Sequence, residues 1–113
     1  MITINIARDY TKMPGGRHIK EGPFSGEHFR ETILKPKYLE SQKTGEGLTV
    51  NLDGGFGYAT SFLEEAFGGL VRDLADPGIL NIHIVSDEEP IWLGKIESYI
   101  KDQLIAKGVL VKG

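Results

Sequence analysis

The chain has 113 residues, of which 40% are hydrophobic and none is cysteine, so we expect one folded domain spanning residues 1–113. The lack of thiols excludes disulfide scaffolds, zinc–thiolate sites, iron–sulfur clusters and cysteine nucleophiles. A net charge of −3 creates no broad phosphate-attracting field, so nucleic acid is not expected as a partner, and no apolar run is long enough to cross a membrane.

The first predicted element is a strand over residues 2–6. Isoleucine alternates with polar residues there, which places Ile2, Ile4 and Ile6 on one face. This segment lacks the continuous apolar stretch of a signal peptide, which favours a cytoplasmic protein.

A Gly/Pro-rich stretch at residues 13–16 then predicts a loop, and residues 17–20 are interpreted as a short return strand. The first helix is expected to open at residues 23–26. Pro36 should end or kink it, because proline donates no amide hydrogen bond and its ring clashes with the preceding turn.

Residues 48–52 have apolar side chains at period two and predict a second strand. Ser61 precedes Glu64 by three residues, the spacing of a capping box, so a helix is expected to start there and to stop at residues 76–78. Five apolar residues at helical spacing form its expected buried stripe: Leu63, Phe67, Leu70, Val71 and Leu74.

Residues 79–85 predict a third strand, and Ser86 with Glu89 form a second capping-box pattern, with Pro90 in the first turn of the last helix. A short terminal strand at residues 109–111 is also considered. The last helix should turn four apolar residues inward: Leu93, Ile96, Ile100 and Leu104.

Strands that alternate with helices indicate an α/β fold with at least partly parallel strands. Polar residues interrupt the strands at Thr49, Asn51, Asn81 and His83, whereas a sheet covered on both faces has near-continuous apolar strands. We therefore expect a small mixed sheet with helices packed mainly on one face.

The loop after the second strand is rich in glycine and includes Asp53, Gly54, Gly55 and Gly57. Backbone amides in such a loop can hold a phosphate, which makes a small-ligand or nucleotide site one interpretation. The other is a tight strand–helix turn that requires glycine for its backbone angles. The dinucleotide fingerprint and the Walker Lys-Ser/Thr pair are both lacking.

Arg17, Ser25 and Arg30 lie in or beside the 14–26 segment, which is expected to fold against the same sheet edge. The arginines could pair with an anion or an acidic partner residue, or form surface ion pairs of little energetic weight. Gly68-Gly69 predicts a close contact between its helix and the sheet or a helix break, and a partner surface is a further interpretation.

The three histidines, at positions 18, 28 and 83, have no metal-like spacing, so no metal site and no cofactor are expected. No arrangement of serine, histidine and aspartate suggests nucleophilic catalysis, and the chain is not expected to be an enzyme.

Three segments resemble a bacterial STAS-like domain family of unknown function, which is related to the anti-sigma-factor antagonists. They are Pro14-Gly15-Gly16-Arg17, residues 22–30 (GPFSGEHFR) and residues 61–70 (SFLEEAFGGL), and the resemblance covers about residues 14–85. It implies a single STAS-like domain with a small sheet and helices on one side. It also implies a signalling role through a protein partner, namely a kinase of the anti-sigma-factor type.

STAS domains are switched by phosphorylation of a serine at a helix N-terminus, and Ser61, with Thr60 just before it, falls at the matching corner of this sequence. The alternative is that Ser61 is a helix cap only, worth roughly 1 kcal/mol. The sequence thus favours a regulatory or protein-interaction module. A small-ligand or nucleotide-binding domain that uses the Gly54–Gly57 turn is the alternative.

Overall fold

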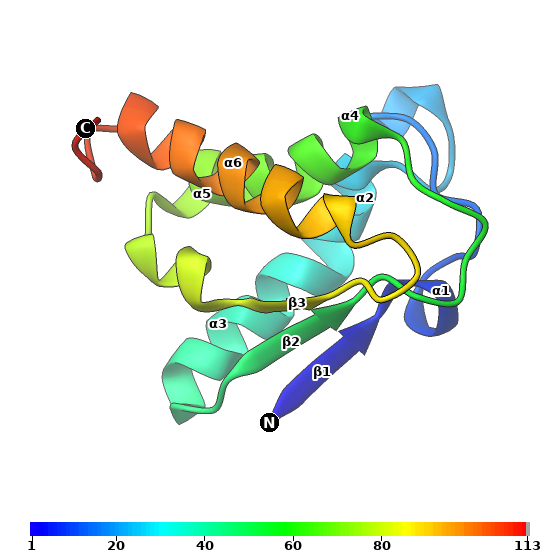
Figure 1. The fold of residues 1–113 in the computed structure, drawn as a ribbon, viewed down its shortest axis with the longest axis horizontal. Coiled ribbons are helices and arrows are strands. Elements are labelled where there is room, and N and C mark those ends of the chain that lie inside the picture. Colours follow the sequence, from blue (N-terminus) through cyan, green and yellow to red (C-terminus); the bar gives the residue numbers. More distant parts are fainter. Residues whose placement is uncertain (113) are drawn as a thin grey trace.

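A computed structural model describes residues 1–112 and shows three strands and a layer of helical segments (Figure 1). The strands are β1 (Ile2–Asn5), β2 (Leu48–Asn51) and β3 (His83–Val85). The α-helices are α1 (Ile6–Asp9), α2 (Gly26–Phe29), α3 (Lys35–Thr44), α4 (Thr60–Leu63), α5 (Gly69–Leu74) and α6 (Ile91–Ala106). Two π turns (Arg30–Leu34 and Glu64–Gly68) and two 3-10 turns (Ile19–Glu21 and Pro77–Asn81) complete the elements.

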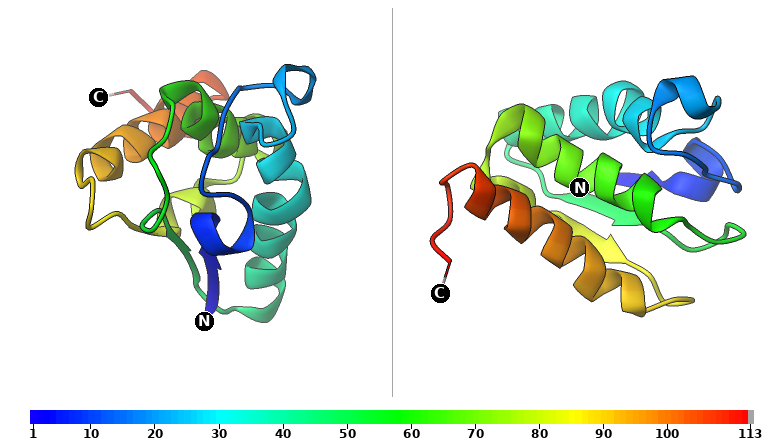
Figure 2. Two further views of the ribbon diagram at one scale, coloured as in Figure 1. Left: turned by 90° about the vertical axis from the view of Figure 1, so that its right-hand side faces the viewer. Right: turned by 90° about the horizontal axis from the view of Figure 1, so that it is seen from above.

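The strands form one parallel sheet in the order β1-β2-β3. Ile4, Val50 and Ile84 lie in register across it. The helices cover one face of the sheet, as Figures 1 and 2 show, while Thr3 and His83 are exposed on the other. The α/β fold with helices on one face is therefore confirmed, and the polar residues that interrupt the strands are what signalled it.

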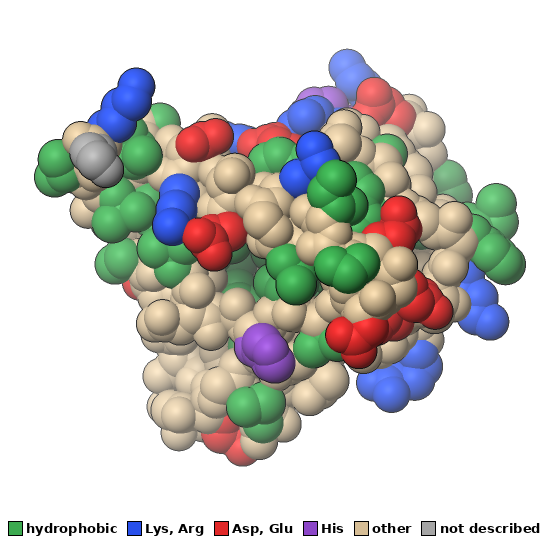
Figure 3. All heavy atoms as spheres, viewed as in Figure 1, with side chains coloured by type: hydrophobic (Ala, Val, Ile, Leu, Met, Phe, Trp, Pro, Cys, Tyr) green, Lys and Arg blue, Asp and Glu red, His purple; other side chains and the backbone are tan. Residues whose placement is uncertain are grey.

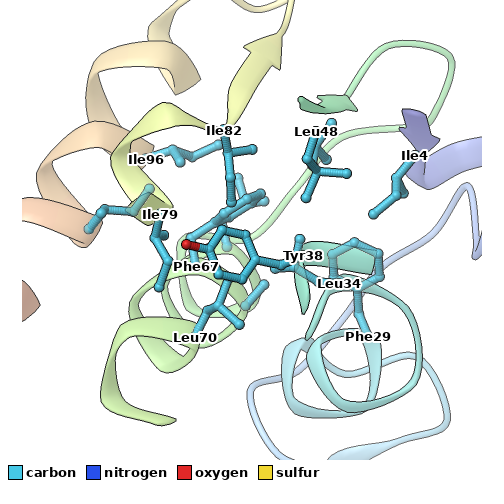
Figure 4. Packing of buried hydrophobic residues seen from close by; sticks show 14 of the residues in the cluster. Ile4, Phe29, Leu34, Tyr38, Leu48, Phe67, Leu70, Ile79, Ile82 and Ile96 are labelled. Carbon is cyan, nitrogen blue, oxygen red and sulfur yellow. The ribbon is translucent and has the colours of Figure 1, made fainter. Parts of the chain in front are cut away.

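The core lies between the sheet and its helical layer (Figure 4). Side chains from the strands, such as Ile4 and Leu48, and from the helices, such as Phe67 and Leu70, point into the same space. Phe67 and Leu70 are completely buried. Their burial confirms the helical stripe that the sequence predicted.

The sequence suggested that Pro36 ends or kinks the first helix, and the structure shows that it does not end it. Helical backbone runs without a break from Gly26 to Thr44 through the π turn at residues 30–34. In that turn the amide of Lys35 donates to the carbonyl of Arg30, five residues back. The wider π turn directly before Pro36 carries the helix past a residue that has no amide hydrogen to donate.

A second continuous helical stretch runs from Thr60 to Leu74, again through a π turn, at residues 64–68. The pair Gly68-Gly69 does not break it. A Cβ atom on Gly69 would collide with the guanidinium of Arg30, and one on Gly68 would collide with the carboxylate of Glu64. The two glycines therefore make room for charged side chains between helices rather than for the sheet.

Several predicted strand segments are wrong or too long. Residues 19–21 form a 3-10 turn where a return strand was expected, and residues 77–81 form another, which shortens the third strand to His83–Val85. Residues 109–111 are not a strand. Because the predicted return and terminal strands do not form, all the strands of the sheet are parallel in the part of the chain that the structure describes.

The inward face of α6 differs by one residue from the prediction. Trp92 is buried at its start, whereas Leu93 is 41% exposed. The helix begins at Ile91, after Pro90, and the hydroxyl of Ser86 donates to the carbonyl of Glu89 instead of capping the helix. The predicted capping box at residues 86–89 is therefore wrong. Among residues 1–112, no helix combines the length and the apolar character needed to span a bilayer.

Candidate functional site

Two loops meet at the edge of the sheet where the parallel strands end, on the right of Figure 1. They comprise residues 10–26, after β1 and α1, and residues 53–61, after β2, and together we call them the rim. The amide of Phe56 donates to the carbonyl of Lys12 at 2.9 Å, which joins the two loops directly. The sequence predicted both loops, and the structure brings them together at one edge.

The rim carries large apolar side chains that are open to solvent. Phe56 is 79% exposed, Met13 70% and Phe24 42%. The space-filling view shows hydrophobic side chains at the right-hand edge of the molecule, where these loops lie (Figure 3). Large apolar side chains exposed on two loops that are joined to each other indicate a surface available for an interaction.

The Gly-rich loop is held in place by acidic groups after β3. The carboxylate of Asp53 accepts hydrogen bonds from the amides of Asp87 (3.1 Å) and Glu88 (2.9 Å). In return, the amide of Gly54 donates to the carboxylate of Glu88 at 2.8 Å. The amide that a phosphate would need at Gly54 is therefore already donated to a carboxylate.

The glycines of this loop adopt backbone angles that fit a tight strand–helix turn. Gly54 has φ +99° and Gly57 has φ +124°, both in the region that other residues rarely adopt. Gly55 packs against the backbone of Lys12, where a Cβ atom would lie 3.2 Å from the carbonyl oxygen. The loop thus uses its glycines for its own geometry and for contact with the other loop.

Ser61 is not the cap of its helix. The helix begins at Thr60, its N-cap is Ala59, and Ser61 is already the second helical residue. Glu64, the expected partner in a capping box, instead pairs with Arg17 and Arg72. The capping box predicted at residues 61–64 is wrong for this reason. Thr60 is exposed and Ser61 half-buried, and both lie on the rim.

Ser25 is the serine that does cap a helix. Its hydroxyl oxygen accepts a hydrogen bond from the amide of His28 at 3.0 Å, and the residue is fully buried. Beside it, a Cβ atom on Gly26 would collide with the carbonyl of Phe62, so glycine is required for the close approach of α2 and α4. Ser25 therefore positions the loop from within and is not part of its surface.

Arg17 and Arg30 bind carboxylates within the chain. Arg17 pairs with Glu64 and Glu65 and keeps 35% of its side chain exposed. Arg30 is buried and donates to Glu65 and, at 3.0 Å, to Asp73. The prediction of surface ion pairs is wrong for Arg30, whose ion pairs are buried. Its burial also keeps this residue away from any external anion.

The same ion pairs set the acidity of Glu64. Hydrogen bonds from Arg72 in the first place, and from Arg17, hold the pKa of this carboxyl group below its usual value, although partial burial opposes the shift. Through Arg17, the carboxylate connects the 10–26 loop to the helical stretch that begins at Thr60.

Tyr10 is a rim residue that the sequence analysis missed. Its hydroxyl lies 2.8 Å from Nδ1 of His28 and 3.2 Å from the carbonyl oxygen of Ser25, and its ring contacts Phe24 and Phe62. Burial raises the pKa of Tyr10 to about 12. A lone aromatic residue at the start of a Gly/Pro-rich loop was the available signal that this loop is anchored.

A family model described as a STAS-like domain of unknown function matches residues 25–90. The match spans Ser25, Arg30, the Gly-rich loop and Thr60-Ser61, and it begins after most of the 10–26 loop. No curated protein and no solved structure matches the chain.

Proposed function

Since this chain belongs to the family of STAS-like domains of unknown function, we propose that it is a non-enzymatic protein-interaction module with a regulatory role, whose partner binds the rim. The observation that carries the proposal is the exposure of Met13, Phe24 and Phe56 on two loops that are joined by a backbone hydrogen bond. A protein partner would bury these side chains, which contribute most to affinity at the centre of an interface.

The rim is supported well enough to present a defined surface. Arg17 and Tyr10 tie the 10–26 loop to the helices, and Asp53 ties the other loop to the turn after β3. A preorganised surface loses little conformational freedom when it binds, which favours affinity. These contacts support a docking role for loops that are otherwise rich in glycine.

We further propose that a phosphate on Thr60 or Ser61 regulates this binding, with a kinase of the anti-sigma-factor type as the partner class. Both hydroxyl groups lie on the rim, and within residues 1–112 neither forms a hydrogen bond that would compete with modification. A phosphate would add about two negative charges to the rim, and burial of those charges in an apolar interface is costly.

The alternative, a nucleotide or small-ligand site at the Gly54–Gly57 turn, gains no support from the geometry. Asp53 and Glu88 surround the turn with negative charge, and the Gly54 amide is occupied. A phosphate would meet repulsion here rather than free donors.

The test compares the proteins retained from a lysate of the native host by the wild-type chain, by Phe56→Ser and by Leu39→Ser. Leu39 lies on α3 and is 47% exposed, so its substitution controls for the loss of an exposed apolar side chain. We expect quantitative mass spectrometry to show a partner that Phe56→Ser loses and Leu39→Ser keeps. Equal recovery by all three chains would argue against the rim as the binding surface.

A further inference from the structure

The two edges of the sheet differ in how well they are blocked against pairing with a further strand. At the β1 edge, the carboxylate of Asp9 accepts from the amide of Asn5 at 2.8 Å, so a charged group occupies that edge. The β3 edge faces an apolar groove of about 190 Å³ between the strand and α6. Natural sheets block their edges with charges, and an unblocked edge beside apolar surface is a template for strand pairing.

The free hydrogen-bonding groups at the β3 edge belong to Ile84. The carbonyl of Val85 accepts from the amide of Leu52 at 2.8 Å, so the backbone groups of Val85 point toward β2. Alternate residues of a strand point their backbone groups to opposite sides, which directs both the amide and the carbonyl of Ile84 outward. In the described part of the chain these two groups have no partner.

Ile84 directs one hydrogen-bond donor and one acceptor outward, so this edge is complementary to the same edge of a second copy. In an antiparallel pair, two residues that face each other directly exchange both of their N–H···O bonds. Ile84 can form this pair with Ile84 of a second copy around a two-fold axis, and the result would be a continuous six-stranded sheet. A two-fold axis also closes the assembly, because the same surface is used on both sides.

The distribution of charge favours this antiparallel arrangement. The acidic turn at residues 87–89 follows β3, and antiparallel pairing of Ile84 with Ile84 places it opposite residues 79–81 of the second copy, away from the second acidic turn. Parallel pairing would set the two acidic turns side by side. Glu97, the acidic residue in the groove, is already paired with Lys101 at 2.8 Å.

The groove supplies the apolar contacts of the same interface. Six of its eight lining residues are leucine or isoleucine, and Leu93 at its border is 41% exposed. Figure 3 shows hydrophobic side chains gathered between α6 and the edge of the sheet. We propose that the chain forms a two-fold dimer through antiparallel pairing of β3 with β3 and burial of this groove, an interface separate from the rim.

Sedimentation equilibrium of the full chain tests the dimer. The wild type should sediment with twice the monomer mass as concentration rises, and Leu93→Lys should raise the dimer Kd by at least about tenfold. Leu39→Lys, which replaces a similarly exposed residue on α3, should leave the Kd unchanged. A wild type that stays monomeric up to about 1 mM, or a dimer indifferent to Leu93→Lys, would overturn the proposal.

Disulfide trapping tests the register, since the chain contains no cysteine of its own. Directly paired residues have Cα atoms about 5.5 Å apart, which lies within the range that a disulfide bridges. Ile84→Cys should therefore form a covalent dimer under mild oxidation, whereas Thr3→Cys on β1 should not. Circular dichroism confirms that both variants fold, and equal cross-linking of the two, or none at Ile84→Cys, would contradict the pairing.

Discussion

The guanidinium of Arg30 donates to Glu65 twice, once to its carboxylate and once to its backbone carbonyl, each at 2.6 Å. Glu65 lies in the π turn at residues 64–68, and both side chains are buried. The one arginine thus neutralises a buried charge and satisfies a carbonyl of the widened turn. Each of the two long helical stretches depends on the other through this contact.

We predict that Arg30→Ala lowers the free energy of unfolding by about 3 kcal/mol, the low end of the range for breaking a buried ion pair, because Glu65 keeps contacts with Arg17 and Arg72. Urea denaturation measures the change. Arg8→Ala, which removes an exposed pair with Asp9, is the control and should have a much smaller effect on the free energy of unfolding. Equal costs for the two variants would show that burial of Arg30 has no energetic weight.

The ion pairs of Glu64 predict a dependence of stability on pH. Its pKa is lower in the folded than in the unfolded chain, so its stabilising contribution is complete above the unfolded value near 4.5 and is lost as the pH falls through the folded value. Glu64→Gln should therefore lower Tm at pH 7 and have a smaller effect at pH 3. Glu97→Gln, at an exposed pair, should change Tm little at either pH. A Tm difference for Glu64→Gln that is the same at both pH values would contradict the assignment.

Phe67→Ala should cost about 3–5 kcal/mol, because the ring is completely buried between the helices and the sheet and its removal leaves a cavity. The midpoint of urea unfolding should fall accordingly. Phe56→Ala removes the same side chain from an exposed position and should leave the midpoint unchanged. An unaltered midpoint for Phe67→Ala would remove this residue from the core.

The two serines at the helix starts should behave differently. Ser25→Ala removes the hydroxyl oxygen that caps α2 and should cost about 1 kcal/mol. Ser61→Ala removes no capping bond, so its effect should stay within about 0.5 kcal/mol. Thermal unfolding of both variants compares them directly. A larger loss for Ser61→Ala than for Ser25→Ala would contradict the observed caps.

The proposed switch predicts that Thr60→Asp and Ser61→Asp weaken binding of the rim partner, while Ser61→Ala binds like the wild type. Ser98→Asp, an exposed position on α6, controls for the added charge. Partner affinity is measured for each variant after circular dichroism has confirmed its fold. If neither aspartate variant lowers affinity, these positions do not regulate the rim.

The strands and the stripe of the second helix could be predicted because side-chain periodicity follows directly from burial on one face. The π turns could not, since adding one residue to a turn shifts the apolar phase without leaving a distinct pattern. The sequence therefore contained no sign that the helix continues past Pro36. For α6 the prediction holds at Ile96, Ile100 and Leu104 and fails only at Leu93, because Trp92 turns inward at the first turn in its place.

For the rim, the sequence predicted the two loops but not which residues their side chains contact or which side chains are exposed. Arg17 and Glu64 are 47 residues apart, and nothing in the local pattern assigns one to the other. The spacing of Ser61 and Glu64 fitted a capping box. The carboxylate of Glu64 instead binds two arginines, which stabilise it more strongly than a backbone amide at the helix start would. The exposure of Phe56 likewise depends on the packing of distant segments.

The π turns also restrict how the chain can change in length. Each residue of a helix turns the backbone by about 100°, so deleting one residue from 64–68 would restore ordinary α geometry and rotate one flank against the other. Phe62 and Leu70, which now both face the core, would then no longer share a face. The number of residues between Thr60 and Leu74 is therefore fixed by the need to keep these side chains on the buried face. Single-residue insertions and deletions should be tolerated near residue 45, between α3 and β2, and rejected between residues 60 and 74.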